Sequence, residues 1–519
     1  MWVLNADEMR EADRRTIEDA GVPESVLMEN AGLAVVERLT EVLSQRPDLR
    51  LRKIAVVCGK GNNGGDGLVV ARLLVESGHD VQAFVLSPIA ALTGDRKEKL
   101  ERARARSVRL HEVVDEDAWK GAFLDVRGAG VVVDAILGTG LKRAAESLAA
   151  VAINDLNALD AYRVAVDVPS GLSAASGRVD GPAVRADLTV ALAAPKVCHF
   201  VPPACLHVGR LEIADIGISA ETIAACAGLL ATIEPEPLVG LLPPRRADAN
   251  KGDFGHLLLV AGSIGKTGAA AMAALSALRS GVGLVTVACP QSTLASIAGF
   301  APEIMTVPLA ETPDGGLAAS TVEQLRELSK GKTALAIGPG LGRNSETEVL
   351  VRRLVGLVSL PVAIDADGIN AFAKDRRALP RGRPVALTPH PGEMARLLGI
   401  SSAEVQEDRL GVARRFATEN EVFIALKGFR TLVAEPTGHV RIATTGNPGM
   451  ATGGTGDVLT GIVGALLAQG VSPGPALQLG VYLHGLAGDL AAHETGQTAL
   501  IATDVLRKIP AALRLLGVP

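Results

Sequence analysis

The chain has 519 residues, of which 48% are hydrophobic and only 3% aromatic, with a formal net charge of −5 and a pI near 6.1. The length predicts two to four domains, and the apolar content is enough for cores built mainly from Ala, Val and Leu. The acidic balance argues against binding to nucleic acid or to an anionic membrane surface. Because no run reaches the 18 apolar residues of a membrane span, no membrane partner is expected.

The N-terminal residues, MWVLNADEMREADRR, include acids and lack an apolar core, so no signal peptide is expected. Five cysteines without a CxxC pair fit a reducing compartment, and we predict a cytoplasmic protein. One short segment holds two cysteines and two histidines, Cys198, His199, Cys205 and His207. Their spacing matches no zinc pattern, so a metal is disfavoured there, and their role stays open.

The first part of the chain predicts helices followed by the opening of a doubly wound α/β sheet. Glu8 to Glu18 and Val26 to Leu43 are predicted helices. A strand, Lys53 to Cys58, then runs into the glycine loop GKGNNGGDG and a helix, Leu68 to Glu76. A strand, a glycine loop and a helix in this order are typical of nucleotide-binding α/β folds.

The same loop matches the dinucleotide pattern GxGxxG through Gly59, Gly61 and Gly64. An ordinary NAD-binding fold also needs an acid at the end of its second strand to hold the ribose. Here the second strand, Val81 to Leu86, ends at Ser87 and Pro88. A conventional NAD-dependent redox enzyme is therefore disfavoured.

Three later predicted strands are each followed by a charged residue. The strands that end near residues 133, 166 and 192 are followed by Asp134, Asp167 and the APK segment with Lys196. A single Asp at a strand end is usually a turn residue, but the carboxyl ends of parallel strands share one edge, where ligands bind. The repeated pattern therefore predicts a site at that edge, formed by Asn62, Asn63, Asp66, Asp134, Asp167, Ser170 and Lys196.

A proline-rich segment, Ile233 to Pro244, is a poor helix and a good connector. We therefore predict an N-terminal domain over residues 1–235 and a C-terminal domain over 245–519. Apolar runs followed by polar or glycine turns continue beyond the connector, which predicts a second α/β domain. The predicted strands are Leu257 to Val260, Leu284 to Val287, Ala334 to Ile337, Val362 to Ile364, Val385 to Leu387 and Val422 to Leu426.

The segment Asn447 to Asp457, NPGMATGGTGD, leads into the helical pattern DVLTGIVGALLAQG. A glycine loop at the start of a helix exposes backbone N–H groups, and the helix dipole adds positive charge there, so a phosphate is the favoured occupant. Asp457 is then either the N-cap of this helix or a base acting on a hydroxyl beside the phosphate. The length of the glycine run favours the functional interpretation.

Taken together, these motifs resemble a known family. LMENAG, GKGNNGGDG, the GTG segment after Asp134, DVPSG and APK are similar to the Rossmann-like NAD(P)H-hydrate epimerase domain. KGDFGHLLLVAGS, GPGLG, TPHPGE, LKGFRT and NPGMATGGTGD are similar to the NAD(P)H-hydrate dehydratase domain, which belongs to the ribokinase-like superfamily. The resemblance covers about residues 1 to 517 and identifies the chain as a member of the fused, bifunctional repair family.

This resemblance implies metabolite repair of hydrated NADH and NADPH. The first domain would be an isomerase that interconverts the R and S hydrates (NADHX and NADPHX), and the second a lyase that dehydrates the S epimer at the cost of a nucleotide phosphate. The implied cofactors are K⁺ in the epimerase domain and Mg²⁺ with ADP or ATP in the dehydratase domain. Fused bacterial members generally use ADP, which we favour, and the family forms homo-oligomers.

The resemblance also assigns residues in the epimerase domain. K⁺ is placed on Asn63, Asp134 and Ser170, which supply the hard oxygen ligands such an ion prefers. Asp167 is expected to transfer protons, because epimerisation through a ring-opened or iminium-like state needs an acid or a base. Substrate binding is assigned to Asn62, Asn63, Gly64, Gly65, Asp66, Gly138, Thr139, Gly140 and Asp167, within segments 62–66 and 138–144.

In the dehydratase domain, Asp457 is by resemblance the base that takes the hydroxyl proton, so that a phosphate can leave in place of hydroxide. The hydrate is expected to contact Ala270, Gly340, His390 and Asp457, although His390, between two prolines, could equally be a structural turn residue. The amides of 453–456 would stabilise the transferred phosphoryl group. Nucleotide binding is assigned to Lys427, Gly428, Phe429, Arg430, Thr431, Asn447, Gly449, Thr452, Gly453, Gly454, Thr455 and Gly456.

Two alternatives remain at this point. A small-molecule kinase of the hydroxyethylthiazole kinase type shares GGTGD, but it would leave a phosphorylated product and does not explain the first domain. Alternatively, the first domain is a non-catalytic binding module for pyridine nucleotides or a partner protein, in which case Asp167 has no catalytic role.

Overall fold

The computed structural model describes residues 1–50, 52–141 and 143–518, and in it the chain forms two compact units. The first is Trp2–Leu230, and the second runs from Ala231 onward together with Met1. The proline-rich connector expected from the sequence already belongs to the second unit. Ile233 donates its backbone N–H to the carbonyl of Ile442 at 2.9 Å, and Leu238, in helix α10 (Glu236–Val239), is buried. The division therefore falls a few residues earlier than the prolines suggest.

The N-terminal unit is built on a seven-stranded sheet with the order β3-β2-β1-β4-β5-β6-β7. The paired strands are all parallel, and the order matches the doubly wound arrangement, which confirms the predicted Rossmann-like class. The strands are β1 Ile54–Cys58, β2 Val81–Val85, β3 Arg109–Glu112, β4 Val131–Ala135, β5 Tyr162–Val166, β6 Leu188–Leu192 and β7 Arg210–Ala214. The helices are α1 Ala6–Arg14, α2 Glu24–Gln45, α3 Pro47–Arg50, α4 Asn62–Glu76, α5 Asp95–Ala105, α6 Glu116–Val126, α7 Ser147–Asn157, α8 Val197–Phe200 and α9 Ala220–Cys226.

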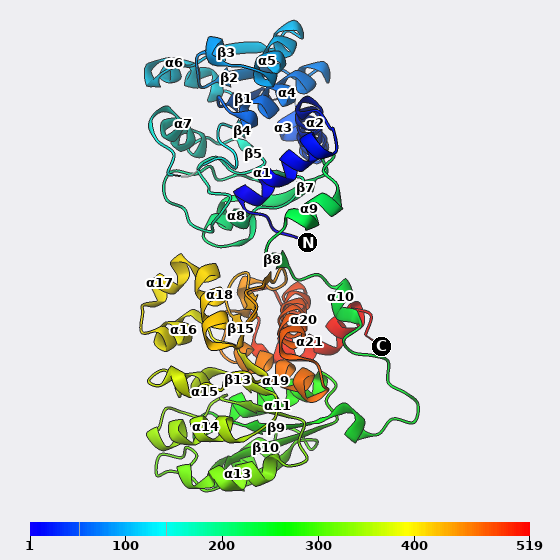
Figure 1. Cartoon of the computed structure of the whole chain (residues 1–519), viewed down its shortest axis with the longest axis vertical. Helices are drawn as coiled ribbons and strands as arrows, with labels where there is room; N and C mark the ends of the chain where they lie inside the picture. Colours follow the sequence, from blue (N-terminus) through cyan, green and yellow to red (C-terminus); the bar gives the residue numbers. More distant parts are fainter. Residues whose placement is uncertain (51, 142, 519) are drawn as a thin grey trace. The chain divides into compact units, whose positions relative to one another are not determined.

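Helices cover both faces of this sheet (Figure 1). Because side chains alternate along a strand, β1 contributes to both cores. Ile54, Val56 and Cys58 pack into the core under α2 and α4, whereas Ala55 and Val57 pack into the core under α6 and α7. β1 is consequently buried along its whole length, and its carboxyl end opens onto the edge where the site forms.

The glycine-rich segment after β1 folds differently from the predicted loop. Helix α4 begins at Asn62, so residues 62–66 form its first turns, and the expectation of a loop there is wrong. The glycines permit this close approach: a Cβ on Gly64 would lie 1.8 Å from the carbonyl oxygen of Gly59, and a Cβ on Gly59 would lie 1.9 Å from that of Ile136. Glycine therefore allows α4 to start directly against the strand ends.

The C-terminal unit contains a ten-stranded sheet with the order β11-β10-β9-β12-β13-β14-β15-β16-β17-β8. Its strands from β11 to β15 are parallel, and β15, β16 and β17 pair antiparallel, which confirms a second α/β domain. The strands are β8 Leu230–Thr232, β9 His256–Val260, β10 Leu284–Pro290, β11 Met305–Leu309, β12 Ala334–Ile337, β13 Val362–Ile364, β14 Val385–Leu387, β15 Phe423–Leu426, β16 Leu432–Ala434 and β17 Val440–Ile442.

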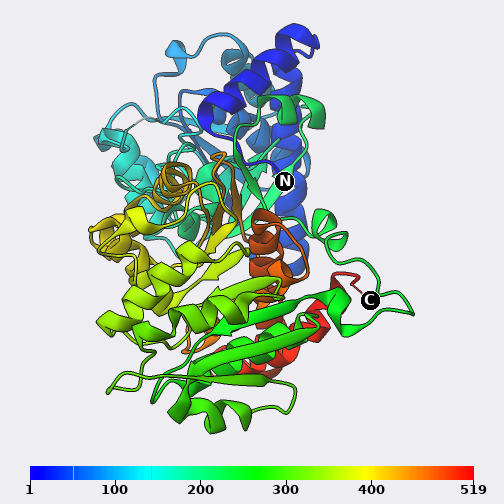
Figure 2. The ribbon, with the colours of Figure 1, turned by 60° about the horizontal axis from the view of Figure 1, so that its bottom comes forward.

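Four helices of this unit, α11, α19, α20 and α21, pack against one another and share one hydrophobic core (Figures 1 and 2). The helices of the unit, besides α10, are α11 Thr267–Arg279, α12 Leu294–Ala298, α13 Val322–Ser329, α14 Ser345–Leu357, α15 Ala366–Asn370, α16 Pro391–Leu398, α17 Ser402–Glu407, α18 Arg409–Asn420, α19 Thr455–Ala468, α20 Pro473–Thr495 and α21 Ala502–Leu515. None of the helices in the described ranges has the length and apolar character needed to cross a membrane.

Helix α19 follows the glycine segment, as predicted, but it begins at Thr455. Its N-cap is Gly454, with a φ of +96°, and no side chain caps this end. Asp457 is therefore the third residue of the helix, so the interpretation of Asp457 as an N-cap is wrong. The left-handed conformation at residue 454 requires glycine, which explains one member of the run.

Candidate active sites

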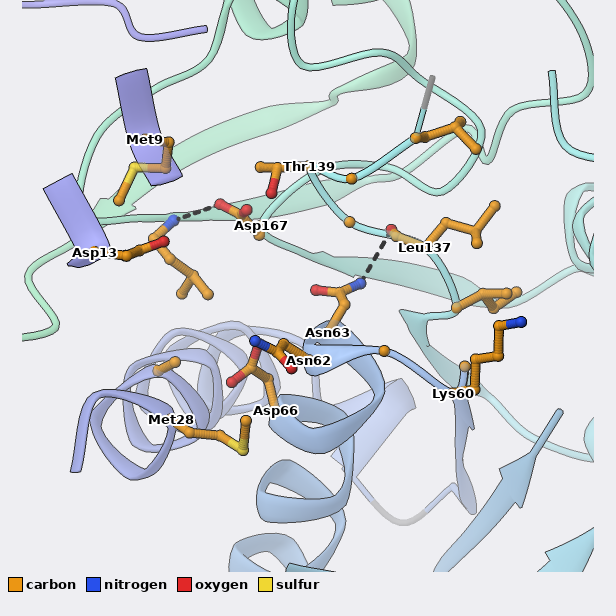
Figure 3. Close-up of a pocket in the computed structure, with 18 of the residues that line it drawn as sticks. Met9, Asp13, Met28, Lys60, Asn62, Asn63, Asp66, Leu137, Thr139 and Asp167 are labelled. Carbon is orange, nitrogen blue, oxygen red and sulfur yellow. Dashed lines mark hydrogen bonds between the residues drawn. The ribbon is translucent and has the colours of Figure 1, made fainter. Parts of the chain in front are cut away.

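The N-terminal unit has a pocket of about 660 Å³ at the carboxyl ends of its strands (Figure 3). Its walls come from α1, α2, the start of α4 and the segments that follow β1, β4, β5 and β6. The sequence-predicted residues that line the pocket are Asn62, Asn63, Asp66, Gly138, Thr139, Gly140, Asp167 and Lys196. Gly64 and Gly65 are buried in the first turns of α4, and Lys142, inside the predicted 138–144 segment, lies outside the described residues.

Asp167, directly after β5, adopts a φ of +64°, which is rare for a residue other than glycine. Its Oδ1 accepts a hydrogen bond from the Leu192 amide at 2.9 Å and forms an ion pair with the Nζ of Lys196. Lys196 is completely buried and also donates to the Leu192 carbonyl at 2.8 Å. Strained backbone held in place by specific partners is common at functional sites, and here it fixes a carboxylate at the wall of the pocket.

His199, whose role was left open by the sequence analysis, helps to place that lysine. It lies in the short helix α8, and its Nδ1 accepts a hydrogen bond from the backbone N–H of Lys196 at 3.0 Å. Burial lowers the pKa of His199 to about 3, and the positive charge of Lys196 acts in the same direction. The imidazole is therefore neutral and acts as an acceptor that anchors the turn carrying Lys196.

Asp134, Ser170 and Asn63 form a second cluster around the carbonyl of Leu137. The Ser170 amide donates to Asp134 Oδ2 at 2.8 Å, and the Ser170 hydroxyl also bonds to the Asp134 carboxylate. Asn63 Nδ2 donates to the Leu137 carbonyl at 3.1 Å. Asp134 is fully buried, and this burial raises its pKa to about 6 despite the hydrogen bonds. The cluster thus gathers an amide, a carboxylate, a hydroxyl and a carbonyl, as the strand-end pattern predicted.

Besides Asp167 and Glu24, the pocket is lined by the carboxyl groups of Asp66 from α4 and Asp13 from α1. Burial raises the pKa of Asp66 well above its usual range, and the negative charges of Asp167 and Asp13 act in the same direction. Burial likewise raises the pKa of Asp13 to about 6. Asp13 carries no motif signal, because one Asp in an amphipathic helix is ordinarily a solvated residue, and the sequence analysis missed it.

In the C-terminal unit, a buried acid organises the carboxyl end of the sheet. Asp365 follows β13 and is only 1% exposed. Its oxygens accept hydrogen bonds from Thr388 at 2.7 Å, from Lys427 Nζ at 2.7 Å and from Thr460 at 2.6 Å. These partners come from the segments after β14 and β15 and from α19, so Asp365 ties three elements together. The sequence analysis assigned no role to Asp365 and missed this site.

Asp457 lies beside that cluster in the first turn of α19. In the described part of the chain, its carboxylate accepts no hydrogen bond and forms no ion pair within 4 Å. Burial raises the pKa of Asp457 to about 7, and the negative charge of Asp365 adds to this, while Lys427 opposes it. A half-buried, unengaged carboxyl group with a pKa near neutrality has the properties of a general base.

Hydrogen bonds to α20 hold the beginning of the glycine segment that precedes α19. Asp489, in α20, accepts hydrogen bonds from the Gly446 amide and from Asn447 Nδ2, both at 2.9 Å. A Cβ on Gly456 would lie 3.3 Å from the Nζ of Lys427. The uncapped helix terminus and a lysine ammonium therefore meet at one point, which is an arrangement suited to a phosphate.

The neighbouring segment 427–431 is fixed by a buried arginine. Arg409, 2% exposed, donates to the carbonyls of Leu426 and Lys427 at 3.2 Å and of Phe429 at 2.6 Å. The Phe429 ring is 51% exposed, and the guanidinium of Arg430 lies 5.3 Å from its centre. An exposed aromatic ring beside a cationic site offers a surface on which a base can stack.

Three residues expected to contact the hydrate have clear structural roles in the fold. His390 is the N-cap of α16, where its Nδ1 accepts from the Gly392 amide at 3.0 Å and Glu393 accepts from the His390 amide at 2.8 Å. Gly340, with a φ of +63°, passes so close to Lys266 that a Cβ would lie 2.7 Å from its carbonyl oxygen. Ala270 is fully buried in α11. Substrate contacts by these residues stay predictions.

The fold and these two sites define a two-part α/β enzyme with a ligand pocket in its first unit and a phosphate-binding helix terminus in its second. Comparison with known proteins makes this specific. Residues 257–511 match the family model described as NAD(P)H-hydrate dehydratase, and residues 24–198 match the model described as YjeF-related protein N-terminus.

Two relatives match along nearly the whole chain. A bifunctional NAD(P)H-hydrate repair enzyme of Moorella thermoacetica is 45% identical, over 99% of this chain and 97% of the relative. The Escherichia coli protein of that name is 35% identical, over 97% and 92%. The structure of a Bacillus subtilis ADP/ATP-dependent NAD(P)H-hydrate dehydratase is 32% identical, over 55% of this chain and 98% of that one, with a TM-score of 0.49. The chain belongs to the family of bifunctional NAD(P)H-hydrate repair enzymes.

Proposed function

We propose that the protein repairs hydrated NADH and NADPH by two reactions. The N-terminal unit interconverts the R and S hydrates, and the C-terminal unit dehydrates the S hydrate to NAD(P)H while a nucleotide is converted to AMP or ADP and phosphate. Membership of the family supports this pairing of activities. The five free cysteines support a reducing, cytoplasmic location, and we infer a homo-oligomer because members of the family form homo-oligomers.

The observation that carries the dehydratase assignment is the unengaged carboxyl group of Asp457 beside the uncapped start of α19. Hydroxide is a poor leaving group, so the hydrate must first be phosphorylated. Asp457 takes the proton of the hydroxyl as its oxygen attacks the terminal phosphoryl group. The amides of 453–456 and Lys427 stabilise the charge on that group. The phosphate then leaves with the C–O electron pair while the ring nitrogen supplies electrons. Loss of a proton from the neighbouring ring carbon to water completes the C=C bond of NAD(P)H.

We further propose that ADP or ATP binds along segments 427–431 and 447–456, with ADP preferred. Phe429 supports this because its exposed ring can stack on adenine, and Lys427 supports it because its ammonium lies beside Gly456. Mg²⁺ bound to the nucleotide neutralises phosphate charge when present. The described residues contain no group of three or more His, Cys, Asp or Glu arranged to hold a metal.

For the N-terminal unit, we propose K⁺ at Asn63, Asp134 and Ser170. The donor set fits, because the Asp134 carboxylate, the Ser170 hydroxyl and the Leu137 carbonyl lie together, and Asn63, whose Nδ2 bonds to that carbonyl, carries an amide oxygen beside them. The buried Asp134 carboxylate also has no cationic side chain within ion-pair distance among the residues described, so a monovalent cation would balance its charge. The ion supplies a fixed positive charge that can bind substrate oxygens.

The direct test is the absorbance of reduced nicotinamide after the protein is mixed with NADH hydrate and either ADP or ATP. We expect the reduced-nicotinamide band to return in step with phosphate release. A phosphorylated organic product without NADH would instead indicate a small-molecule kinase. If neither nucleotide restores the band, the dehydratase assignment is wrong.

The raised pKa of Asp457 predicts how dehydration depends on pH. A general base must be ionised to accept a proton, so activity is lost as the pH falls through the pKa of about 7 and is retained above it. We expect kcat/KM for the S hydrate to rise through neutrality to a plateau. A profile that is flat across neutral pH would contradict Asp457 as the base.

Replacing Gly456 with Val should weaken nucleotide binding with little loss of fold. Residue 456 has no left-handed φ, and the nearest atom to an added Cβ is the flexible tip of Lys427, at 3.3 Å. The branched side chain would occupy space beside the phosphates, so we expect ADP affinity by calorimetry to fall about tenfold or more. Gly454→Val is the contrast, because its φ of +96° and an approach of 2.5 Å to Met272 predict a lower Tm. Unchanged affinity in Gly456→Val would place the phosphate elsewhere.

A further inference from the structure

Asp13 lies in the last turn of α1. A capping box between Asn5 and Glu8 fixes the start of this helix. Its side chain lines the N-terminal pocket, where Asp13, Asp66 and Asp167 surround the same space (Figure 3). In the described part of the chain, the Asp13 carboxyl group has neither a hydrogen-bond donor nor an ion-pair partner within 4 Å. Asp13 is therefore a half-buried acid whose carboxyl group forms none of these interactions with the described residues.

Asp167 is in a different state. Its Oδ1 is occupied by the buried ammonium of Lys196 and by the Leu192 amide. Both partners are hydrogen-bond donors, and one of them is a buried ammonium, so the Asp167 side chain is already engaged in an ion pair. It can accept a proton or stabilise a cation, but it is poorly suited to start the reaction as a proton donor.

A donor must therefore come from another group in the pocket. Glu24, at the rim, accepts a hydrogen bond from Asn62 Nδ2 at 3.0 Å. Burial raises the pKa of Asp13 to about 6, Lys196 opposes this shift, and the negative charges of Asp167 and Glu24 add to it. Asp66 faces the same charges from α4. Asp13 thus retains a protonated fraction near neutral pH and can also release its proton, as an acid–base catalyst must.

We propose that Asp13 is a catalytic acid–base residue of the N-terminal site and exchanges protons with the hydrate in partnership with the Asp167 carboxylate. The proposal rests on the epimerase activity proposed above. It deepens that activity, because it names the second of the two proton-transfer groups that the reaction requires and assigns a role to α1.

The step balances with these two groups alone. Asp167 takes the proton from the hydroxyl at the hydrated ring carbon, and a C=O bond forms there. The C–N bond to the ring nitrogen breaks with its electron pair on nitrogen, which receives the proton of Asp13. The open-chain aldehyde turns about its C–C bond, and the nitrogen attacks the other face of the carbonyl carbon. Asp13 then recovers its proton from nitrogen, Asp167 returns its proton to oxygen, and the hydroxyl has the opposite configuration.

The test uses the full chain with Asp13→Asn, and Asp7→Asn as the matched control. Asp7 lies on the same helix but does not line the pocket, and its carboxylate pairs with Arg10 at the surface. Pure R hydrate is supplied, and the appearance of S hydrate is followed by chiral separation. We expect kcat of Asp13→Asn to fall about 10²-fold or more with KM within a few-fold, as is usual when a general acid or base is removed. Asp7→Asn should keep the wild-type rate.

Two further readouts separate catalysis from structure. Asp13→Glu should recover part of kcat, and the wild-type pH profile should contain a limb near pH 6 that Asp13→Asn lacks. The proposal is overturned if wild-type protein epimerises and Asp13→Asn does so at a similar rate, or if Asp66→Asn alone abolishes the reaction while Asp13→Asn leaves kcat unchanged. If wild-type protein itself does not epimerise the hydrate, it is the proposed epimerase function that fails.

Discussion

Asp457→Asn is expected to abolish nucleotide-dependent dehydration, with a rate loss of roughly 10² to 10⁴. Asparagine keeps the shape of the side chain but cannot accept the hydroxyl proton. Because the Asp457 carboxylate forms no hydrogen bond that caps α19, the substitution should leave the Tm almost unchanged. The measurement is the initial rate of NADH formation from pure S hydrate, together with a thermal melt.

Asp504 provides a matched control for this substitution. It occupies the same third position in α21, but its carboxylate accepts a hydrogen bond from the Ile501 amide at 3.1 Å and so does cap its helix. Asparagine can still accept that hydrogen bond but loses the negative charge near the helix N-terminus, so Asp504→Asn should lower stability by about 0.3–1 kcal/mol and leave the rate of dehydration intact. If Asp457→Asn behaves like Asp504→Asn, with lost stability and retained rate, then Asp457 is structural and the kinase-like step loses its base.

Asp167→Asn is expected to stop epimerisation while dehydration continues. With a mixture of both hydrates and ADP, the reaction should begin at the normal rate and then stall with the R hydrate left over, apart from slow spontaneous epimerisation. Dehydration should accept one epimer only, because a hydroxyl held away from Asp457 loses orders of magnitude in rate. Progress curves by absorbance, with chiral separation of the residue, measure this directly.

Asparagine is the appropriate replacement at this position. Among residues other than glycine, Asn adopts the left-handed backbone conformation of Asp167 at a lower steric cost than Ala does. Loss of the Asp167 charge leaves Lys196 buried without its partner, so a lower Tm is expected, and the rate on pure S hydrate reports whether the protein remains folded. Consumption of both epimers at the wild-type rate would show that Asp167 is not catalytic or that dehydration is not stereospecific.

Strand ends proved to be the most informative feature of the sequence. Asp134, Asp167 and Lys196 follow β4, β5 and β6, which are neighbours in the sheet, so residues far apart in sequence had to meet at one edge. That argument needs only a parallel sheet with the usual strand order. The same logic applied to Asp365, after β13, would have found the buried acid of the second site.

Other features depend on tertiary packing and could not be predicted. The sequence of residues 62–66 predicts a loop, because glycine disfavours helices. In the structure α4 begins there, against Gly59, where only a residue without a Cβ fits at position 64. Asp457 looks like an N-cap, but Gly454 takes the cap position through its left-handed φ. Asp13 gives no local signal, because only the packing of α1 over the pocket distinguishes it from a surface acid.

The central account is that two separate active sites act on a shared substrate. Its most direct test is complementation between two full-length variants, each of which lacks one of the two activities. Asp167→Asn and Asp457→Asn are each given both hydrates and ADP, first alone and then mixed. The account predicts that Asp167→Asn stalls with R hydrate, that Asp457→Asn forms almost no NADH, and that the mixture converts all of the substrate. A mixture that still stalls with R hydrate would contradict the account, because Asp457→Asn would then lack a working epimerase site.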